Sequence, residues 1–162
     1  MKSRVDFDHQ ANKNILAYLR HTHVKYKAHL PVSTSPSFIK DPYHELGTHP
    51  ELVKRLWDEL AEKIPLDCKW IVYGTPVLVN PFSGILFGFA FGTKTYGMRL
   101  PERERQEMYA AGATTHYDYN DGFSFDITEI GRDWVLGGWL KGERLWCMAA
   151  YTHAQQLGEA DK

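Results

Sequence analysis

The chain has 162 residues, of which 43% are hydrophobic and 24% charged, so it can bury a core without metal or disulfide support. Nineteen lysines and arginines against twenty aspartates and glutamates give a net charge of −1. Because proteins that bind nucleic-acid phosphates need a basic surface, this balance disfavours binding to DNA or RNA.

The sequence predicts a cytoplasmic protein with no membrane segment. The first ten residues are polar and charged and lack the apolar stretch of a secretory signal. The longest apolar run, residues 85–91, is far shorter than the roughly 20 residues that a membrane span needs. Cys68 and Cys147 form no CxxC motif, and in the cytoplasm we expect both thiols to be reduced.

Residues 1–47 are polar and rich in histidine, and we predict that they form an N-terminal arm. A short helix is expected at about 8–19, with Asp8 as its N-cap, and its apolar residues are Ile15, Leu16 and Leu19. Residues 31–43, which are rich in proline and serine, are typical of an extended loop.

The clearest helix signal covers residues 48–64. Thr48 and Glu51 have the spacing of a capping box with Thr48 as the N-cap, and Pro65 ends the helix. Apolar residues recur at helical spacing opposite a charged face, so this helix is expected to cover a sheet. The apolar face consists of Leu52, Val53, Leu56, Trp57, Leu60 and Ile64.

Short β-rich runs follow, separated by turn residues. Connections of about two to five residues suit hairpins and are too short for parallel crossovers, so we predict an antiparallel meander. The predicted strands are 69–73, 76–80, 85–91 and 95–100.

The last third of the chain carries two more predicted helices. The expected elements are a helix at 102–111, a hairpin of 114–119 and 123–127, a Gly-Trp segment at 131–139 and a final helix at 143–156. We predict one α+β domain over 48–157, with its sheet packed by the helices at 50–64 and 143–156, and a frayed tail at 158–162.

Residues 72–100 read Tyr-Gly-Thr-Pro, an apolar hairpin, and then Tyr-Gly-Met-Arg-Leu. This order resembles the opening of TfoX N-terminal and MmcQ/YjbR-like domains, and residues 134–154, with Trp146 and the run Ala-Ala-Tyr-Thr-His-Ala, resemble their closing helix. The resemblance covers roughly residues 50–154 and implies an α+β fold, but it transfers no catalytic residues. The 47-residue arm, the Gly-Trp segment and the missing basic surface depart from that family and argue against a DNA-linked role.

Known catalytic and metal-binding patterns do not occur in the sequence. There is no GxSxG elbow, Walker loop or HExxH motif, and the eight histidines do not pair with cysteines at the spacing of a zinc site. We therefore predict no catalytic residue, no metal and no cofactor. The tryptophans either complete the core, which we favour, or build an interface, where such rings carry much of the binding energy.

We predict a non-enzymatic protein-interaction or regulatory module, of the inhibitor or immunity type, with a protein partner; a homo-oligomer is left open. The candidate partner- or ligand-binding residues are Tyr43, His44, His49, Arg99, Trp134, Trp139 and Trp146. The alternative is an enzyme or small-ligand-binding protein with a site assembled from scattered residues, for instance His44, His49, Arg99 and Asp126. A cleft that holds titratable groups would favour the alternative, and a flat aromatic patch would favour the interaction module.

Overall fold

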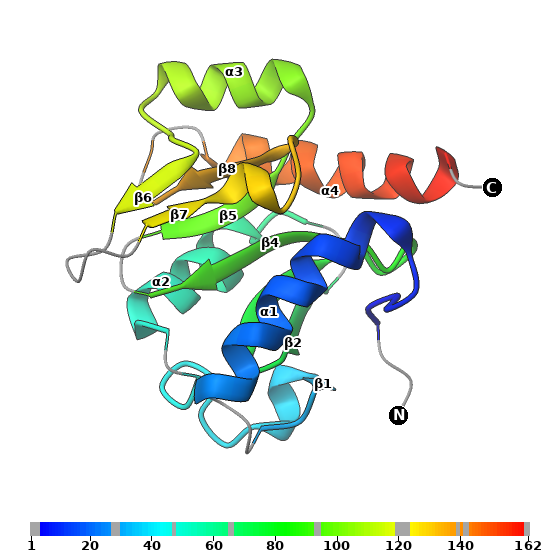
Figure 1. The fold of residues 1–162 in the computed structure, drawn as a ribbon, viewed down its shortest axis with the longest axis vertical. Helices are drawn as coiled ribbons and strands as arrows, with labels where there is room; N and C mark the ends of the chain where they lie inside the picture. Colours follow the sequence, from blue (N-terminus) through cyan, green and yellow to red (C-terminus); the bar gives the residue numbers. More distant parts are fainter. Residues whose placement is uncertain are drawn as a thin grey trace.

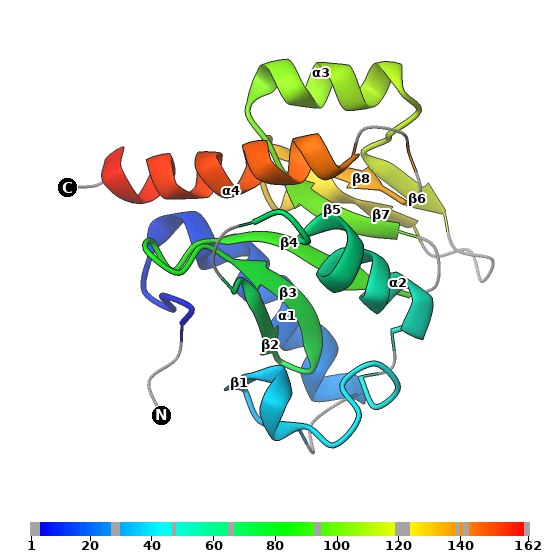
Figure 2. The same cartoon turned by 180° about the vertical axis from the view of Figure 1, so that it is seen from behind.

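A six-stranded antiparallel sheet with helices on both faces organises the chain (Figures 1 and 2). The computed structural model describes residues 4–26, 30–46, 48–64, 67–92, 95–118, 124–138, 140 and 143–160. The predicted α+β class and the antiparallel sheet packed by amphipathic helices are thereby confirmed.

The strand order is β1-β2-β3-β4-β5-β8, and every neighbouring pair is antiparallel. The strands are β1 (Ser33–Thr34), β2 (Lys69–Val72), β3 (Thr75–Val79), β4 (Leu86–Phe91), β5 (Thr95–Arg99) and β8 (Trp134–Gly137). The four strands predicted between residues 69 and 100 form β2 to β5, and each bound lies within one residue of its prediction. The two edge strands were not predicted: β1 comes from the expected loop and β8 from the Gly-Trp segment.

A separate two-stranded sheet is formed by β6 (His116–Asp118) and β7 (Ser124–Asp126). These strands are the predicted hairpin, although its turn at 119–123 lies outside the described residues. The 3-10 turn η4 (Ile127–Glu129) then leads towards β8. A backbone bridge between Thr114 and Leu136 fixes this region to the edge strand.

One face of the main sheet is covered by α2 (Pro50–Lys54), its π-helical continuation η3 (Arg55–Leu60) and α4 (Glu143–Ala160). The predicted apolar stripe of the first of these helices is buried against the sheet, as expected from its periodicity. The final helix continues past its predicted end at Gln156 to Ala160, and residues 161–162 of the predicted tail lie outside the described residues.

The start of α2 differs from the prediction. His49, and not Thr48, is the N-cap, because its Nδ1 accepts the backbone N–H of Glu51 at 3.2 Å. Pro50 occupies the first helical position, where its missing N–H costs nothing. Thr48 is buried and donates its hydroxyl to the carbonyl oxygen of Ala90 on β4 at 3.5 Å.

The opposite face of the sheet is covered by α1 (Lys13–Tyr26), which follows the 3-10 turn η1 (Gln10–Asn12). This helix begins and ends later than the predicted 8–19, and His9, not Asp8, caps the turn before it. Its apolar residues Ile15, Leu16 and Leu19 are buried in the second core cluster. Buried Asn12 joins this helix to the start of β4 by accepting the backbone N–H of Leu86 at 3.0 Å.

The helix α3 (Glu102–Ala110) runs beside α4 near the β8 edge of the sheet (Figures 1 and 2). Trp146 lies between the two helices and donates its Nε1–H to Glu107 Oε2 at 3.0 Å. Among the helices of the described residues, none combines the length and apolar character needed to cross a bilayer.

Replacement of Leu56 by alanine tests the packing of the α2 side. Because this side chain is fully buried, the substitution should cost about 2–5 kcal/mol of unfolding free energy, measured by urea denaturation. Leu145→Ala is the matched control, since Leu145 is 77% exposed and should change stability by less than about 0.5 kcal/mol. Equal losses in both variants would contradict the assignment of Leu56 to the core.

Candidate functional site

The structure places the first three sequence candidates in the segment before α2 and in its cap. Tyr43 donates its hydroxyl to the Asp58 carboxylate at 3.0 Å and packs edge-on against Trp57. His44 is exposed, with Nδ1 2.9 Å from Asp41 Oδ2, and His49 is the helix cap described above. Each of these three side chains is therefore held by local contacts. The three side chains do not meet at one site.

The tryptophan candidates are not presented together either. Trp134 is 0% exposed and packs against Phe89 in the core beneath α1, so its ring cannot meet a partner. Trp146 is half-buried between α3 and α4, and Trp139 lies outside the described residues. Of the two roles that the sequence allowed for the tryptophans, core or interface, Trp134 therefore has the core role.

The glycine of the Gly-Trp segment at position 137 has a packing role. A Cβ atom there would lie 2.7 Å from both Tyr96 Oη and Glu143 Oε2. Arg55 from the π-helix holds the neighbouring backbone, because it binds Glu143 Oε1 at 2.7 Å and also donates to the carbonyl oxygens of Gly138 and Leu140. The ion pair between Arg55 and Glu143 therefore fixes the backbone that follows β8.

Arg99 is the sequence candidate that belongs to a larger constellation. It is 7% exposed, and its Nε donates to Asp133 Oδ2 at 2.8 Å. Its guanidinium carbon lies 5.5 Å from the ring centroid of Trp134, its cross-strand neighbour. Asp126, proposed with it in the alternative hypothesis, instead caps the turn η4 by accepting the N–H of Thr128.

His153 of α4 completes the constellation. Its Nε2 lies 3.0 Å from the same Asp133 Oδ2, and its side chain is 17% exposed. Burial alone would raise the pKa of Asp133, but the hydrogen bond from His153 and the charge and hydrogen bond of Arg99 outweigh it and hold that pKa below its usual range.

The ionised Asp133 carboxylate has no proton to give, so the proton in this hydrogen bond must belong to His153 Nε2. In the neutral imidazole this fixes the tautomer and leaves Nδ1 as an acceptor. No hydrogen bond to Nδ1 occurs within the part of the chain that the structure describes.

His153 lies on the wall of a groove of about 350 Å³ between α3 and α4. The groove is lined by Pro101, Glu104, Met148, Ala149, Thr152, His153 and Gln156. Its lining combines apolar surface with a few polar groups, and its volume falls in the range of small-ligand sites, about 300–1,000 Å³. We regard this groove, with His153 held by Asp133 and Arg99, as the candidate site.

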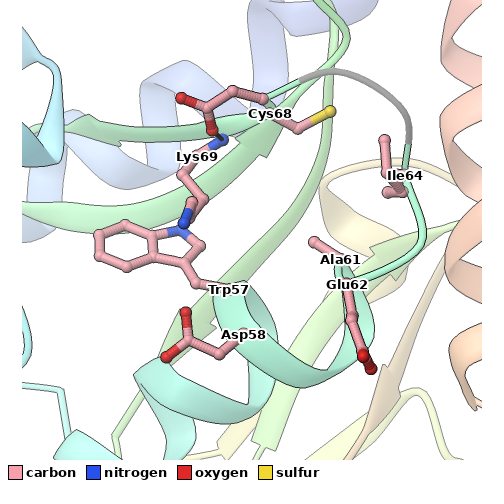
Figure 3. A pocket seen from close by; sticks show the side chains of 8 residues that line it. Trp57, Asp58, Ala61, Glu62, Ile64, Cys68 and Lys69 are labelled. Carbon is pink, nitrogen blue, oxygen red and sulfur yellow. Dashed lines mark hydrogen bonds between the residues drawn. The ribbon is translucent and has the colours of Figure 1, made fainter.

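A second hollow, of about 370 Å³, lies between the end of η3 and the start of β2 (Figure 3). Its acids already have partners: Asp58 accepts from Tyr43, Glu62 lies 3.3 Å from Arg144, and Asp67 lies 3.7 Å from Arg4. Burial raises the pKa of the Cys68 thiol to about 12, so the thiolate needed for nucleophilic chemistry is disfavoured. This hollow therefore has fewer groups available to bind or react with a ligand than the groove has.

A third hollow, of about 430 Å³, separates the N-terminal segment from the end of α4. Its histidine, His9, already accepts the backbone N–H of Ala11 through Nδ1 as the cap of η1. Across the described ranges, no group of three or more His, Cys, Asp or Glu side chains is placed to hold a metal ion.

No known family model, curated protein or solved structure matches this chain. The likeness to TfoX N-terminal and MmcQ/YjbR-like domains therefore stays an expectation from the sequence, and the function has to be argued from the groove itself.

Sequence reasoning singled out Arg99 but missed Asp133 and His153. The two residues are twenty positions apart, one just before β8 and the other within α4, so no local motif links them. The only signal was the charge of Arg99 on the predicted strand 95–100, which is compatible with a bound carboxylate and equally with an edge residue whose charge reaches solvent.

The pH dependence of stability tests the Asp133 contacts. A carboxyl group whose pKa is lowered on folding stabilises the protein above its unfolded pKa of about 3.9, and this contribution is lost as the pH falls through the folded value. Asp133→Asn should therefore cost about 1–3 kcal/mol at pH 7 and reduce the loss of stability between pH 5 and pH 3.

Urea unfolding at a series of pH values measures both effects. Asp8→Asn is the control, because Asp8 is exposed and should behave like the unaltered protein. If Asp133→Asn keeps the full acid sensitivity of the unaltered protein, the argued contacts of Asp133 are wrong.

Proposed function

We propose that the protein binds a small organic ligand in the groove between α3 and α4, with His153 as its proton-accepting contact. One observation carries this proposal: Asp133 Oδ2 lies 2.8 Å from Arg99 Nε and 3.0 Å from His153 Nε2. Because the carboxylate uses the Nε2 proton, the Nδ1 acceptor of a groove-lining residue is left for a ligand.

A histidine oriented by a carboxylate keeps one tautomer and one ring orientation, which favours repeated binding of the same partner atom. Such a histidine can accept a hydrogen bond from a ligand, and it can also take up a proton as a general base. Binding needs only the hydrogen bond, so we propose a small-ligand-binding protein; catalysis would also require a ligand proton whose removal starts a reaction.

This proposal favours the alternative drawn from the sequence over the interaction module. The candidate residues for a partner surface included Trp134, which is buried in the core. Exposed large apolar residues do occur, but on different elements: Phe38 is 67% exposed on η2 (Pro36–Phe38) and Leu145 lies on α4. Within the described residues, the candidate tryptophans do not form an exposed aromatic patch.

The two cysteines are buried and free of disulfides in the structure. Reduced buried thiols are typical of proteins in a reducing compartment, which supports the proposal that the protein acts in the cytoplasm.

A fragment screen tests the proposed function. Small neutral fragments with a hydroxyl or amide donor should shift the backbone NMR signals of Ala149, Thr152 and His153. Loss of the imidazole in His153→Gln should weaken these fragments about two- to tenfold, the range of one hydrogen bond. His44→Gln, at an exposed histidine away from the groove lining, should leave their affinity unchanged. Fragments that shift only residues elsewhere, or that bind His153→Gln equally well, would refute the proposal.

A further inference from the structure

The geometry points to a specific ligand class: we infer that the groove binds a small organic ammonium ion, namely a primary amine with a short apolar chain. This inference rests on the proposed function, because it names the ligand of the same site. It follows from the charge, the hydrogen-bonding capacity and the apolar surface of the groove lining.

The charge argument begins with Glu104. This half-buried carboxylate lines the groove and has no ion-pair partner among the described residues. The neighbouring arginines of α3 are directed elsewhere: Arg103 lies 3.4 Å from Glu107, and Arg105 donates to the carbonyl oxygen of Leu100. A ligand cation would supply the charge that Glu104 lacks.

No lysine or arginine lines the groove, so no cationic side chain of the lining pairs with Glu104. The buried arginine of the constellation, Arg99, is already paired with Asp133 at 2.8 Å. A negatively charged ligand would therefore be repelled by the unpaired Glu104 carboxylate, whereas a positively charged ligand would form an ion pair with it.

Hydrogen bonding leads to the same ligand. The Glu104 carboxylate can only accept, and the neutral His153 tautomer offers Nδ1 as a second acceptor. An ammonium group has three donors and no acceptor, so one such group can donate to each of two acceptors. Thr152 and Gln156 can donate or accept and do not discriminate between ligands.

The apolar part of the lining limits the rest of the ligand. Pro101, Met148 and Ala149 offer aliphatic surface and an adaptable thioether in a groove of about 350 Å³. This volume suits a short branched alkyl chain better than a large aromatic system.

The guanidinium of Arg99 is the one feature of the constellation that favours an anionic ligand. Arg99 Nη1 is buried and makes no hydrogen bond within the described residues, so it could attract a carboxylate. Arg99 is not part of the groove lining, and its Nε already donates to Asp133 Oδ2 at 2.8 Å. The experiment therefore includes an anionic probe.

Three probes of nearly equal shape separate the possibilities: 3-methylbutylamine, 3-methylbutan-1-ol and 3-methylbutanoate. Each is titrated into the full chain at pH 8 and low salt, while the amide signals of Ala149, Thr152 and His153 are followed by NMR. The amine should bind about fivefold tighter than the alcohol, as expected for a partly exposed ion pair, and the carboxylate should bind weakest. The advantage of the amine should shrink in 0.5 M salt.

Glu104→Gln should remove the preference for the amine, so that the amine and the alcohol bind the variant with about equal affinity. Glu102→Gln is the matched control, because it removes an equal charge from the same helix at an exposed residue that does not line the groove. The inference is overturned if the amine binds no tighter than the alcohol, if the carboxylate binds tightest, or if the amine shifts no groove signal. The proposed function is judged separately by the neutral fragments and His153→Gln, so it survives equal binding of the three probes.

Discussion

The carboxylate of Asp133 joins the elements that build the candidate site. It accepts hydrogen bonds from Arg99 at the end of β5 and from His153 on α4, while its own residue directly precedes β8. A buried guanidinium is costly unless a charge and hydrogen bonds compensate it, so Arg99 constrains where Asp133 lies. Asp133 in turn constrains the imidazole, and the position of α4 beside α3 sets the shape of the groove.

The centre of the fold could be predicted because its signals are local. Turn residues separate β2 to β5, and the periodic apolar residues of the helix that follows residue 48 indicate which face it buries. Its cap could not be assigned from spacing alone, because Thr48 bonds to Ala90 on β4 and leaves the cap to His49. That choice depends on tertiary contact, which a capping-box pattern does not record.

The site could not be predicted because it depends on contacts between distant segments. His153 is oriented by Asp133, which also binds Arg99. The positions of Asp133 and Arg99 follow from the pairing of β5 with β8, and β8 was not predicted from the sequence. Trp134 shows the same limit: a tryptophan in a glycine-rich segment can be core or surface, and the packing of α1 against its sheet face decides for the core. Arg99 could be singled out because a charged residue within a predicted strand can be recognised from the sequence alone.

The tautomer of His153 tests the central claim most directly, and a long-range 1H–15N spectrum of the histidine side chains reports it. In the neutral imidazole, the proton should reside on Nε2 and Nδ1 should carry the resonance of an unprotonated acceptor, because the Asp133 carboxylate lies 3.0 Å from Nε2. A proton on Nδ1, or rapid exchange between both forms as in a free imidazole, would contradict the account.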